Sequence, residues 1–203
     1  MNANITRPTI REIPLADGLR TSPSGFIAQR KMDGRFELLQ WNKCLVAGER
    51  MRDGRFYAFD AAIIQGDDCR RSPFRDRLAA LRQIAAGFPA GMKLVQEGAG
   101  GEFLEAVLAD GGEGVVFKNP DGYWGIGQWK CKRQETFDVR VMALHRQSAL
   151  ISFEGEQAGA VPIYGAARAS VAIGSVIEIS AMCRTSSGKF REPRFIRCRP
   201  DKN

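Results

Sequence analysis

Lys31 is the residue of this chain whose setting first suggests covalent chemistry. It lies two residues before Asp33-Gly34, just after the apolar-leading run Gly25-Phe26-Ile27-Ala28, which predicts a strand. Glycine supplies the backbone freedom that a tight turn requires. The pattern therefore predicts a strand that delivers Lys31 to a turn, where it could act as a nucleophile. The same residues also fit an ordinary surface lysine beside a hairpin turn, so the choice depends on the rest of the chain.

Four further blocks carry residue types that suit the same chemistry. They are 47–49 with the aromatic run 56–60, then 112–118, 129–133 and 193–202. In the block 129–133, Lys130 and Lys132 are two residues apart and therefore share one face of a strand. Taken singly, each block has an ordinary explanation: turn acids, solvated strand lysines, a core phenylalanine or a basic tail. Their order and spacing favour one common site.

The elements that must position the first four blocks are strands and two helices. Apolar and alternating patterns predict strands over 26–31, 35–41, 44–46, 55–64, 92–96, 114–118 and 128–133, with Asp-Gly turns at 33–34 and 53–54. Ser72 followed by Pro73 predicts an N-cap and an N1 proline for a helix that runs to about residue 86. A shorter helix is predicted over 102–109, before Gly111-Gly112.

The pattern changes near residue 136. Short strands are predicted over 138–144, 150–153, 160–164, 175–181 and 193–198. Five strands in about seventy residues suit a Greek-key barrel of the OB type. We therefore predict an α+β protein, with an antiparallel-sheet domain over 1–136 followed by an all-β OB-fold domain over 137–203.

The composition is that of a soluble globular protein with a polyanionic partner. The 203 residues carry a net charge of +7, and 44% of them are apolar. Five dispersed cysteines and the single His145 argue against a disulfide framework, a zinc site or serine–histidine catalysis. The N-terminus resembles no secretory signal, and no apolar run is long enough to span a bilayer. We expect a cytoplasmic protein with no membrane partner.

The motif set, over residues 25–202, resembles the covalent nucleotidyltransferase superfamily and most closely the ATP-dependent DNA ligases. Those enzymes share a Lys-x-Asp-Gly motif, an aromatic-Ala-Phe-Asp block, Glu-Gly-Val-Val-x-Lys, a Lys-x-Lys strand and a C-terminal Arg-x-Asp-Lys. All of these occur here in that order. The resemblance implies a nucleotidyltransferase (adenylation) domain followed by an OB domain, in agreement with the boundary predicted above.

The resemblance also implies a mechanism. Lys31 would take AMP from ATP and pass it to a 5′-phosphate, after which a 3′-hydroxyl would displace AMP. Asp33 belongs to the same catalytic motif. An amine attacks phosphorus only in its neutral form, which neighbouring cations such as Lys130 and Lys132 favour. The same two lysines can neutralise charge that builds on the phosphate.

Further residues match the family's nucleotide and metal positions. Phe59 would stack on adenine, and Gln29 would accept a hydrogen bond from the adenine amine. Glu49 would contact the ribose or the metal, and Glu113 would help hold Mg²⁺ or Mn²⁺, since hard cations prefer oxygen ligands. The remaining predicted nucleotide contacts are Arg35, which lies one place before the arginine that ligases usually carry, Lys118, and the C-terminal Arg199 and Lys202.

The C-terminal segment 184–202 contains seven lysines and arginines and only two acids. In relatives Arg-x-Asp-Lys, here Arg199, Asp201 and Lys202, swings over ATP to orient pyrophosphate; the same basic stripe could instead grip DNA phosphates. Nicked duplex DNA is the expected substrate, and we expect a monomeric, minimal enzyme without the N-terminal DNA-clamping domain of large ligases.

Two alternatives remain open on the sequence alone. One is an RNA ligase or a capping-type nucleotidyltransferase, which shares much of the motif set. The other is a degenerate ligase that binds nucleic acid without forming a lysine adduct. An NAD-dependent ligase is disfavoured, because the zinc-binding cysteines of that class are absent from the sequence.

Overall fold

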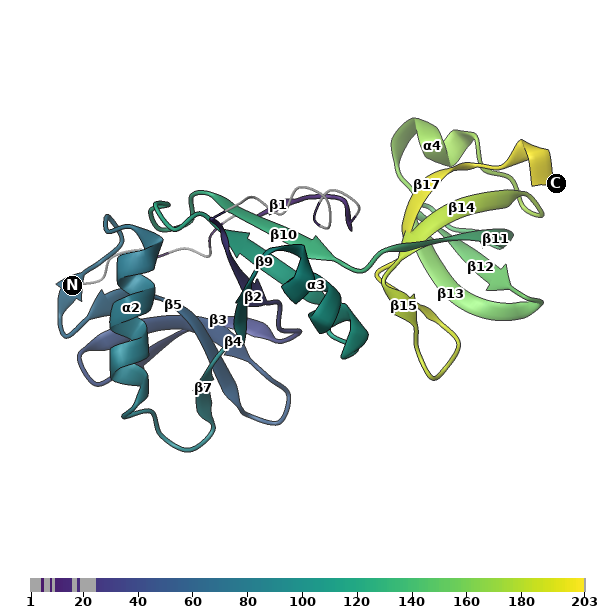
Figure 1. Cartoon of the computed structure of the whole chain (residues 1–203). Coiled ribbons are helices and arrows are strands. Elements are labelled where there is room, and N and C mark those ends of the chain that lie inside the picture. Colours follow the sequence, from purple (N-terminus) through teal and green to yellow (C-terminus); the bar gives the residue numbers. More distant parts are fainter. Residues whose placement is uncertain (1–4, 6–7, 9, 16–17, 19–24, 203) are drawn as a thin grey trace. The chain divides into compact units, whose positions relative to one another are not determined.

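The chain forms two compact units, Met1–Lys132 and Arg133–Asn203. The computed structural model describes residues 5, 8, 10–15, 18 and 25–202 (Figure 1). The predicted boundary between 136 and 137 lies inside strand β11 (Glu135–Leu144), the first strand of the second unit. The assignment of the units as adenylation and OB domains stays a prediction.

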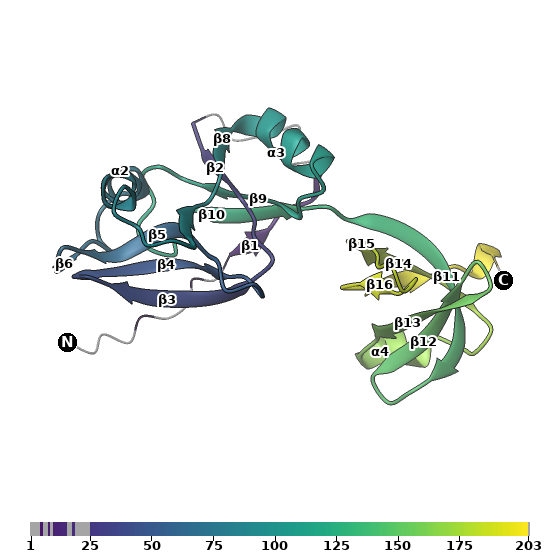
Figure 2. The same cartoon turned by 90° about the horizontal axis from the view of Figure 1, so that it is seen from below.

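The first sheet of unit 1 has one polar and one apolar face. Its strand order is β1-β10-β9-β2-β8, with bounds Arg11–Glu12, Gln128–Lys132, Gly114–Lys118, Ile27–Arg30 and Glu97–Ala99. Helix α3 (Gly100–Ala109) buries Leu104 and Val107 with Ala28, Val115 and Phe117. Figure 2 shows α3 on the side of β9 and β10 that faces away from the second sheet. Side chains that alternate with this apolar set therefore lie on the opposite face of the first sheet.

The second sheet of unit 1 packs against helix α2 (Phe74–Ala85). It contains β3 (Arg35–Trp41), β4 (Cys44–Arg50), β5 (Phe56–Ile64) and β6 (Asp67–Asp68), and β7 (Met92–Leu94) pairs with β5. Leu81 of α2 is fully buried among Val46, Phe56 and Ala58 of the sheet. The apolar face of this sheet therefore lies under α2.

Helix α2 begins one residue later than the sequence predicted. Pro73 occupies the N-cap position, with extended backbone angles, and no side chain among the described residues caps the helix. The expected cap from Ser72 is therefore wrong; its carbonyl oxygen instead accepts a hydrogen bond from Arg77 Nη1 at 2.5 Å.

Unit 2 is built on one five-stranded antiparallel sheet. Its order is β13-β12-β11-β14-β17, in which β12 is Ser148–Phe153, β13 Glu156–Pro162, β14 Val176–Ala181 and β17 Arg194–Cys198. A small hairpin, β15 (Cys183–Arg184) with β16 (Phe190–Arg191), the helix α4 (Gly165–Ala169) and the 3-10 turn η1 (Pro200–Lys202) complete it. Its core is formed by buried residues such as Val141, Ile151, Val161, Ile177 and Ile179.

The predicted mixed, sheet-rich fold is confirmed, with three local corrections. Two strand pairs are parallel rather than antiparallel, β1 with β10 and β5 with β7. Strand β4 continues through the polar end of its segment to Arg50, because both neighbours, β3 and β5, pair with it there. Helix α4, the β15–β16 hairpin and strands β6 and β8 were not predicted. No helix in the described part of the chain is long and apolar enough to cross a membrane.

Candidate active site

Lys31 and Glu113 form an ion pair at one end of the first sheet. Lys31 directly follows β2, and its backbone N–H donates to the Gly114 carbonyl oxygen at 2.8 Å. Its Nζ lies 2.6 Å from Glu113 Oε1, and the Glu113 side chain is only 6% exposed. The structure thus brings together two residues that the motifs assigned to one site.

Gly114, the residue after Glu113, lets strand β9 lie close to strand β10. Its φ is +146°, and a Cβ there would lie 2.1 Å from the Cys131 carbonyl oxygen on β10. Any other residue would push β9 away from β10. The glycine of the Glu-Gly-Val-Val block thus has a backbone role, next to the residue that contacts Lys31.

The polar face of the first sheet places two predicted residues, Gln29 and Lys130, in one row. This row crosses all five strands of the sheet. In order along the row, each residue directly opposite the next, it contains Glu97, Gln29, Val116, Lys130 and Glu12. Directly opposed residues share a face. Gln29 and Lys130 are therefore on the same face, from strands far apart in the sequence. Glu97 and Glu12 were not identified by sequence reasoning, because strand pairing alone brings them to this row.

The two lysines of β10 differ in their surroundings. Lys130 Nζ lies 3.3 Å from Glu12 Oε2, and both side chains are about one quarter exposed. Lys132 is buried, at 5% exposure, and pairs in register with Gly114, beside the Lys31–Glu113 contact. In the strand register, the backbone of Lys132 therefore lies nearer to the Lys31–Glu113 ion pair than the backbone of Lys130 does.

Lys118 connects the two sheets of unit 1. Its Nζ donates to the Phe59 carbonyl oxygen on β5 at 3.1 Å and lies 4.5 Å from the centroids of the Phe59 and Phe74 rings. Burial lowers the pKa of Lys118 to about 8, with opposing effects from the nearby Asp60, which raises it, and Arg77, which lowers it. The predicted nucleotide residues Lys118 and Phe59 are therefore in direct contact.

Arg77 of α2 and Asp60 of β5 form a buried ion pair close to Lys118. Arg77 Nε and Nη2 each lie 2.9 Å from an oxygen of Asp60, in a two-bond arrangement, and both side chains are at most 3% exposed. Sequence reasoning missed Arg77, although its spacing from Phe74, Leu78 and Leu81 places it on the buried face of α2. Asp60 also follows Phe56 and Ala58 at the two-residue period of the buried face of β5.

The predicted residues Arg35 on β3 and Glu49 on β4 lie on opposite faces of the second sheet. Glu49 lies opposite Phe36 and Tyr57 in the register, and the Phe36 ring is 6.2 Å from the Phe59 ring. Arg35 lies on the other face, is 82% exposed at its side chain and is 3.8 Å from Glu37. Phe36, which the sequence analysis did not select, thus shares the face with Glu49, and Arg35 does not.

Asp33 lies outside the strands, in the bend between β2 and β3. It is exposed, whereas the adjoining lysine of its motif is held by Glu113. The described residues include no group of three or more His, Cys, Asp or Glu side chains placed to hold a metal ion. The predicted metal ligands Glu49 and Glu113 therefore belong to no such group among the described residues.

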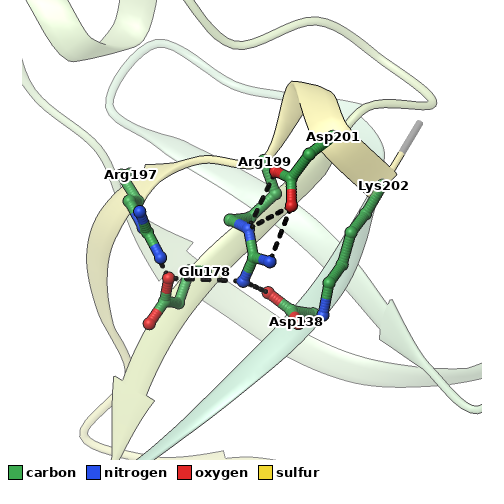
Figure 3. A network of polar contacts seen from close by, with 6 residues as sticks. All are labelled: Asp138, Glu178, Arg197, Arg199, Asp201 and Lys202. Atoms are coloured by element: carbon green, nitrogen blue, oxygen red, sulfur yellow. Dashed lines mark hydrogen bonds and ion pairs between the residues drawn. The ribbon is translucent and has the colours of Figure 1, made fainter.

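In unit 2 the predicted C-terminal residues belong to a network of ion pairs (Figure 3). Arg199 Nη1 lies 2.9 Å from Asp138 Oδ1 and 3.5 Å from Glu178 Oε2, and Arg199 Nη2 lies 2.8 Å from Asp201. Lys202 Nζ binds the second Asp138 oxygen at 2.5 Å. The hydrogen bonds from Arg199 lower the pKa of Asp201 to about 2, and the same contacts raise the pKa of Arg199.

Solved structures of DNA ligases share this fold. A Lig E DNA ligase, described as binding DNA with a minimal scaffold, superposes with a TM-score of 0.75 over 95% of this chain and 98% of its own, at 18% identity. The ligase domain of Mycobacterium tuberculosis LigD gives a TM-score of 0.54 over 96% of each chain, at 18% identity. These likenesses identify the class of fold as that of DNA ligases.

Sequence relatives agree with this class over part of the chain. Proteins named "Probable DNA ligase" from Saccharopolyspora erythraea and Mycolicibacterium paratuberculosis are 38% and 37% identical over 94 and 95 residues. Each match covers 43% of this chain, which spans only 18% of the relatives' length. No established family profile matches the chain. The resemblance to ATP-dependent DNA ligases that the motifs indicated is confirmed.

Proposed function

We propose that this chain is an ATP-dependent DNA ligase that seals nicks through a lysyl-AMP intermediate. The observation that carries the proposal is the 2.6 Å contact between Lys31 and Glu113, at the end of a sheet whose polar face also carries Gln29 and Lys130. Lys31 attacks the α-phosphate of ATP as a neutral amine and pyrophosphate leaves. The AMP then passes to a DNA 5′-phosphate, and a 3′-hydroxyl displaces it.

Two buried oxygens support ATP as the substrate. Gln29 Oε1 and Glu113 Oε2 have no hydrogen-bond partner among the described residues, although both are shielded from solvent. Buried acceptors without partners are costly, so they suit groups that a ligand or ion brings. An amino group of adenine fits the oxygen of Gln29, and Phe59 offers a ring for stacking.

A divalent cation bound by carboxylates also fits the proposal. Glu113 and Glu49 would hold Mg²⁺ or Mn²⁺, since carboxylate oxygens are the ligands these ions prefer. The cation would stabilise negative charge on the phosphates. The two oxygens of Glu113 also differ in their surroundings, because Oε1 contacts Lys31 while Oε2 is left for another partner.

Unit 2 supports the DNA-binding part of the proposal. Its five antiparallel strands fit an OB-type barrel, and the two end strands of the sheet, β13 and β17, contact each other as closure requires. Together with the net charge of +7, this suits nicked duplex DNA as the partner of a monomeric enzyme. Arg199 and Lys202 would orient pyrophosphate in the first step, for which they must exchange their carboxylate partners for phosphate.

The test is a labelled-nucleotide assay on the intact chain. The wild-type protein is incubated with labelled ATP or labelled GTP and a divalent cation, and the acid-labile protein adduct is measured. An adduct from ATP is expected, and both Lys31→Ala and Lys31→Arg should abolish it, because a guanidinium does not deprotonate to attack phosphorus. An adduct in either variant would contradict the role of Lys31. A wild-type protein that binds nicked DNA but forms no adduct would instead be a nucleic-acid-binding module.

A further inference from the structure

Gln29 presents one buried oxygen whose direction is fixed by a neighbour. The Gln29 side chain donates from Nε2 to Glu97 Oε1 at 3.3 Å, and the residue is 2% exposed. An ionised carboxylate only accepts hydrogen bonds, so the amide nitrogen must face Glu97. The amide oxygen therefore points away from Glu97, and it is the buried acceptor without a partner described above.

Glu97 is itself held in place. Its Oε2 pairs with Arg82 of α2, its Cα is in register with Gln29 across β2 and β8, and its side chain is only 16% exposed. Arg82 therefore holds the Glu97 carboxylate in place, and that carboxylate fixes the orientation of the Gln29 amide.

This orientation matters because an amide alone does not distinguish purines. A glutamine can turn its oxygen toward an amino group or its nitrogen toward an oxo group, and both pairs are equally good. With a carboxylate beside it, the turned amide would place oxygen against oxygen and lose its hydrogen bond. With Glu97 beside it, the Gln29 amide therefore presents only its oxygen, a hydrogen-bond acceptor, to the ligand.

We propose that Glu97 is a positioning residue that sets the base selectivity of the nucleotide site. By holding the Gln29 amide with its oxygen toward the ligand, it selects a purine with an amino group at C6 over one with an oxo group there. The inference rests on the proposed function, because it takes the polar face of the first sheet as the base-binding surface. That face also carries Lys118, which contacts the Phe59 ring.

The test compares Glu97→Gln with the wild type and with a matched control. Asp110→Asn makes the same change of acid to amide at an exposed residue, 69% exposed, that pairs with Arg30. For each protein, the kcat/KM for lysyl-adduct formation is measured with labelled ATP and with labelled GTP. Glu97→Gln should lower the ATP-to-GTP ratio by about tenfold, chiefly by a gain in GTP use, because a glutamine at 97 accepts either orientation of Gln29. Asp110→Asn should keep the wild-type ratio.

A second variant keeps the inference testable if Glu97→Gln does not fold. Gln29→Met removes the selecting oxygen from a side chain of similar length, so the ratio should fall through loss of ATP use without a gain for GTP. A wild type that uses ATP, together with an unchanged ratio in whichever of these variants folds, would overturn the inference and leave the proposed function intact. A wild type that forms no adduct with either nucleotide would overturn both.

Discussion

Lys118 makes the stability of unit 1 depend on pH in the alkaline range. Its side chain is 2% exposed, and burial is the main cause that lowers its pKa from 10.5 to about 8. The charged groups that face it come from three elements: Asp60 on β5 and Glu97 on β8 favour the ammonium form, whereas Arg77 on α2 disfavours it. The lowered pKa therefore persists in spite of two nearby carboxylates.

The sign of the effect follows from the protons bound by each state. Between pH 8 and 10.5 the unfolded chain still holds the Lys118 proton, while the folded chain has released it. Stability rises with pH wherever the unfolded state binds more protons, so the free energy of unfolding should increase by about 3 kcal/mol across this window. Below pH 8 both states are protonated, and this lysine adds no further pH dependence.

Tryptophan fluorescence is the suitable probe, because all three tryptophans of the chain, Trp41, Trp124 and Trp129, lie in unit 1. Denaturant unfolding would be measured between pH 7.5 and 10.5 for the wild type and for Lys118→Met, which lacks the titrating group but keeps the length of the side chain. The wild type should gain about 3 kcal/mol relative to the variant over this range. Parallel stability curves for the two proteins would refute the reasoning, since every other alkaline titration is common to both.

Three further outcomes are expected. Phe59→Ala should raise the ATP concentration needed for adduct formation more than it lowers thermal stability; a variant that merely unfolds, and that ATP does not rescue, would show that the ring is only core. Arg77→Met should lower the free energy of unfolding of unit 1 by roughly 3–5 kcal/mol, because Asp60 loses its buried ion-pair partner, and a loss below about 1 kcal/mol in fluorescence-detected unfolding would contradict this. Arg199→Ala should block adduct formation from ATP yet still seal a nick supplied already adenylated; equal loss in both assays would mean that its contact with Asp138 mainly stabilises unit 2.

Sequence patterns predicted a helix or strand of this chain correctly where the apolar spacing is visible within a few neighbouring residues. The alternation of 35–41 and 55–64 and the helical spacing of Phe74, Leu78 and Leu81 are visible within a few residues, and the structure has strands and a helix there. The same spacing places Arg77 on the buried face of α2, but an arginine is usually exposed unless it is paired, and its partner Asp60 lies on another element. The cap predicted at Ser72 is wrong because Pro73 has extended backbone angles, so the helix begins at Phe74.

Contacts between distant strands could not be predicted in this way. Gln29 and Glu97 are 68 residues apart, and only the register of β2 against β8 brings the amide and the carboxylate together. The sequence identified Gln29 through its motif position, but nothing near it indicated which way the amide would face.

The positive charge of the C-terminal segment is partly balanced by acids from other strands. The segment 184–202 is strongly basic by sequence, which favoured it as a surface for phosphates. In the structure, Arg197, Arg199 and Lys202 pair with Glu178 and Asp138, which come from β14 and β11 (Figure 3). Phosphate must therefore displace these carboxylates before it can bind there. The anion affinity of this segment thus depends on acids about 20 to 60 residues earlier in the chain, and their removal should strengthen it at low salt.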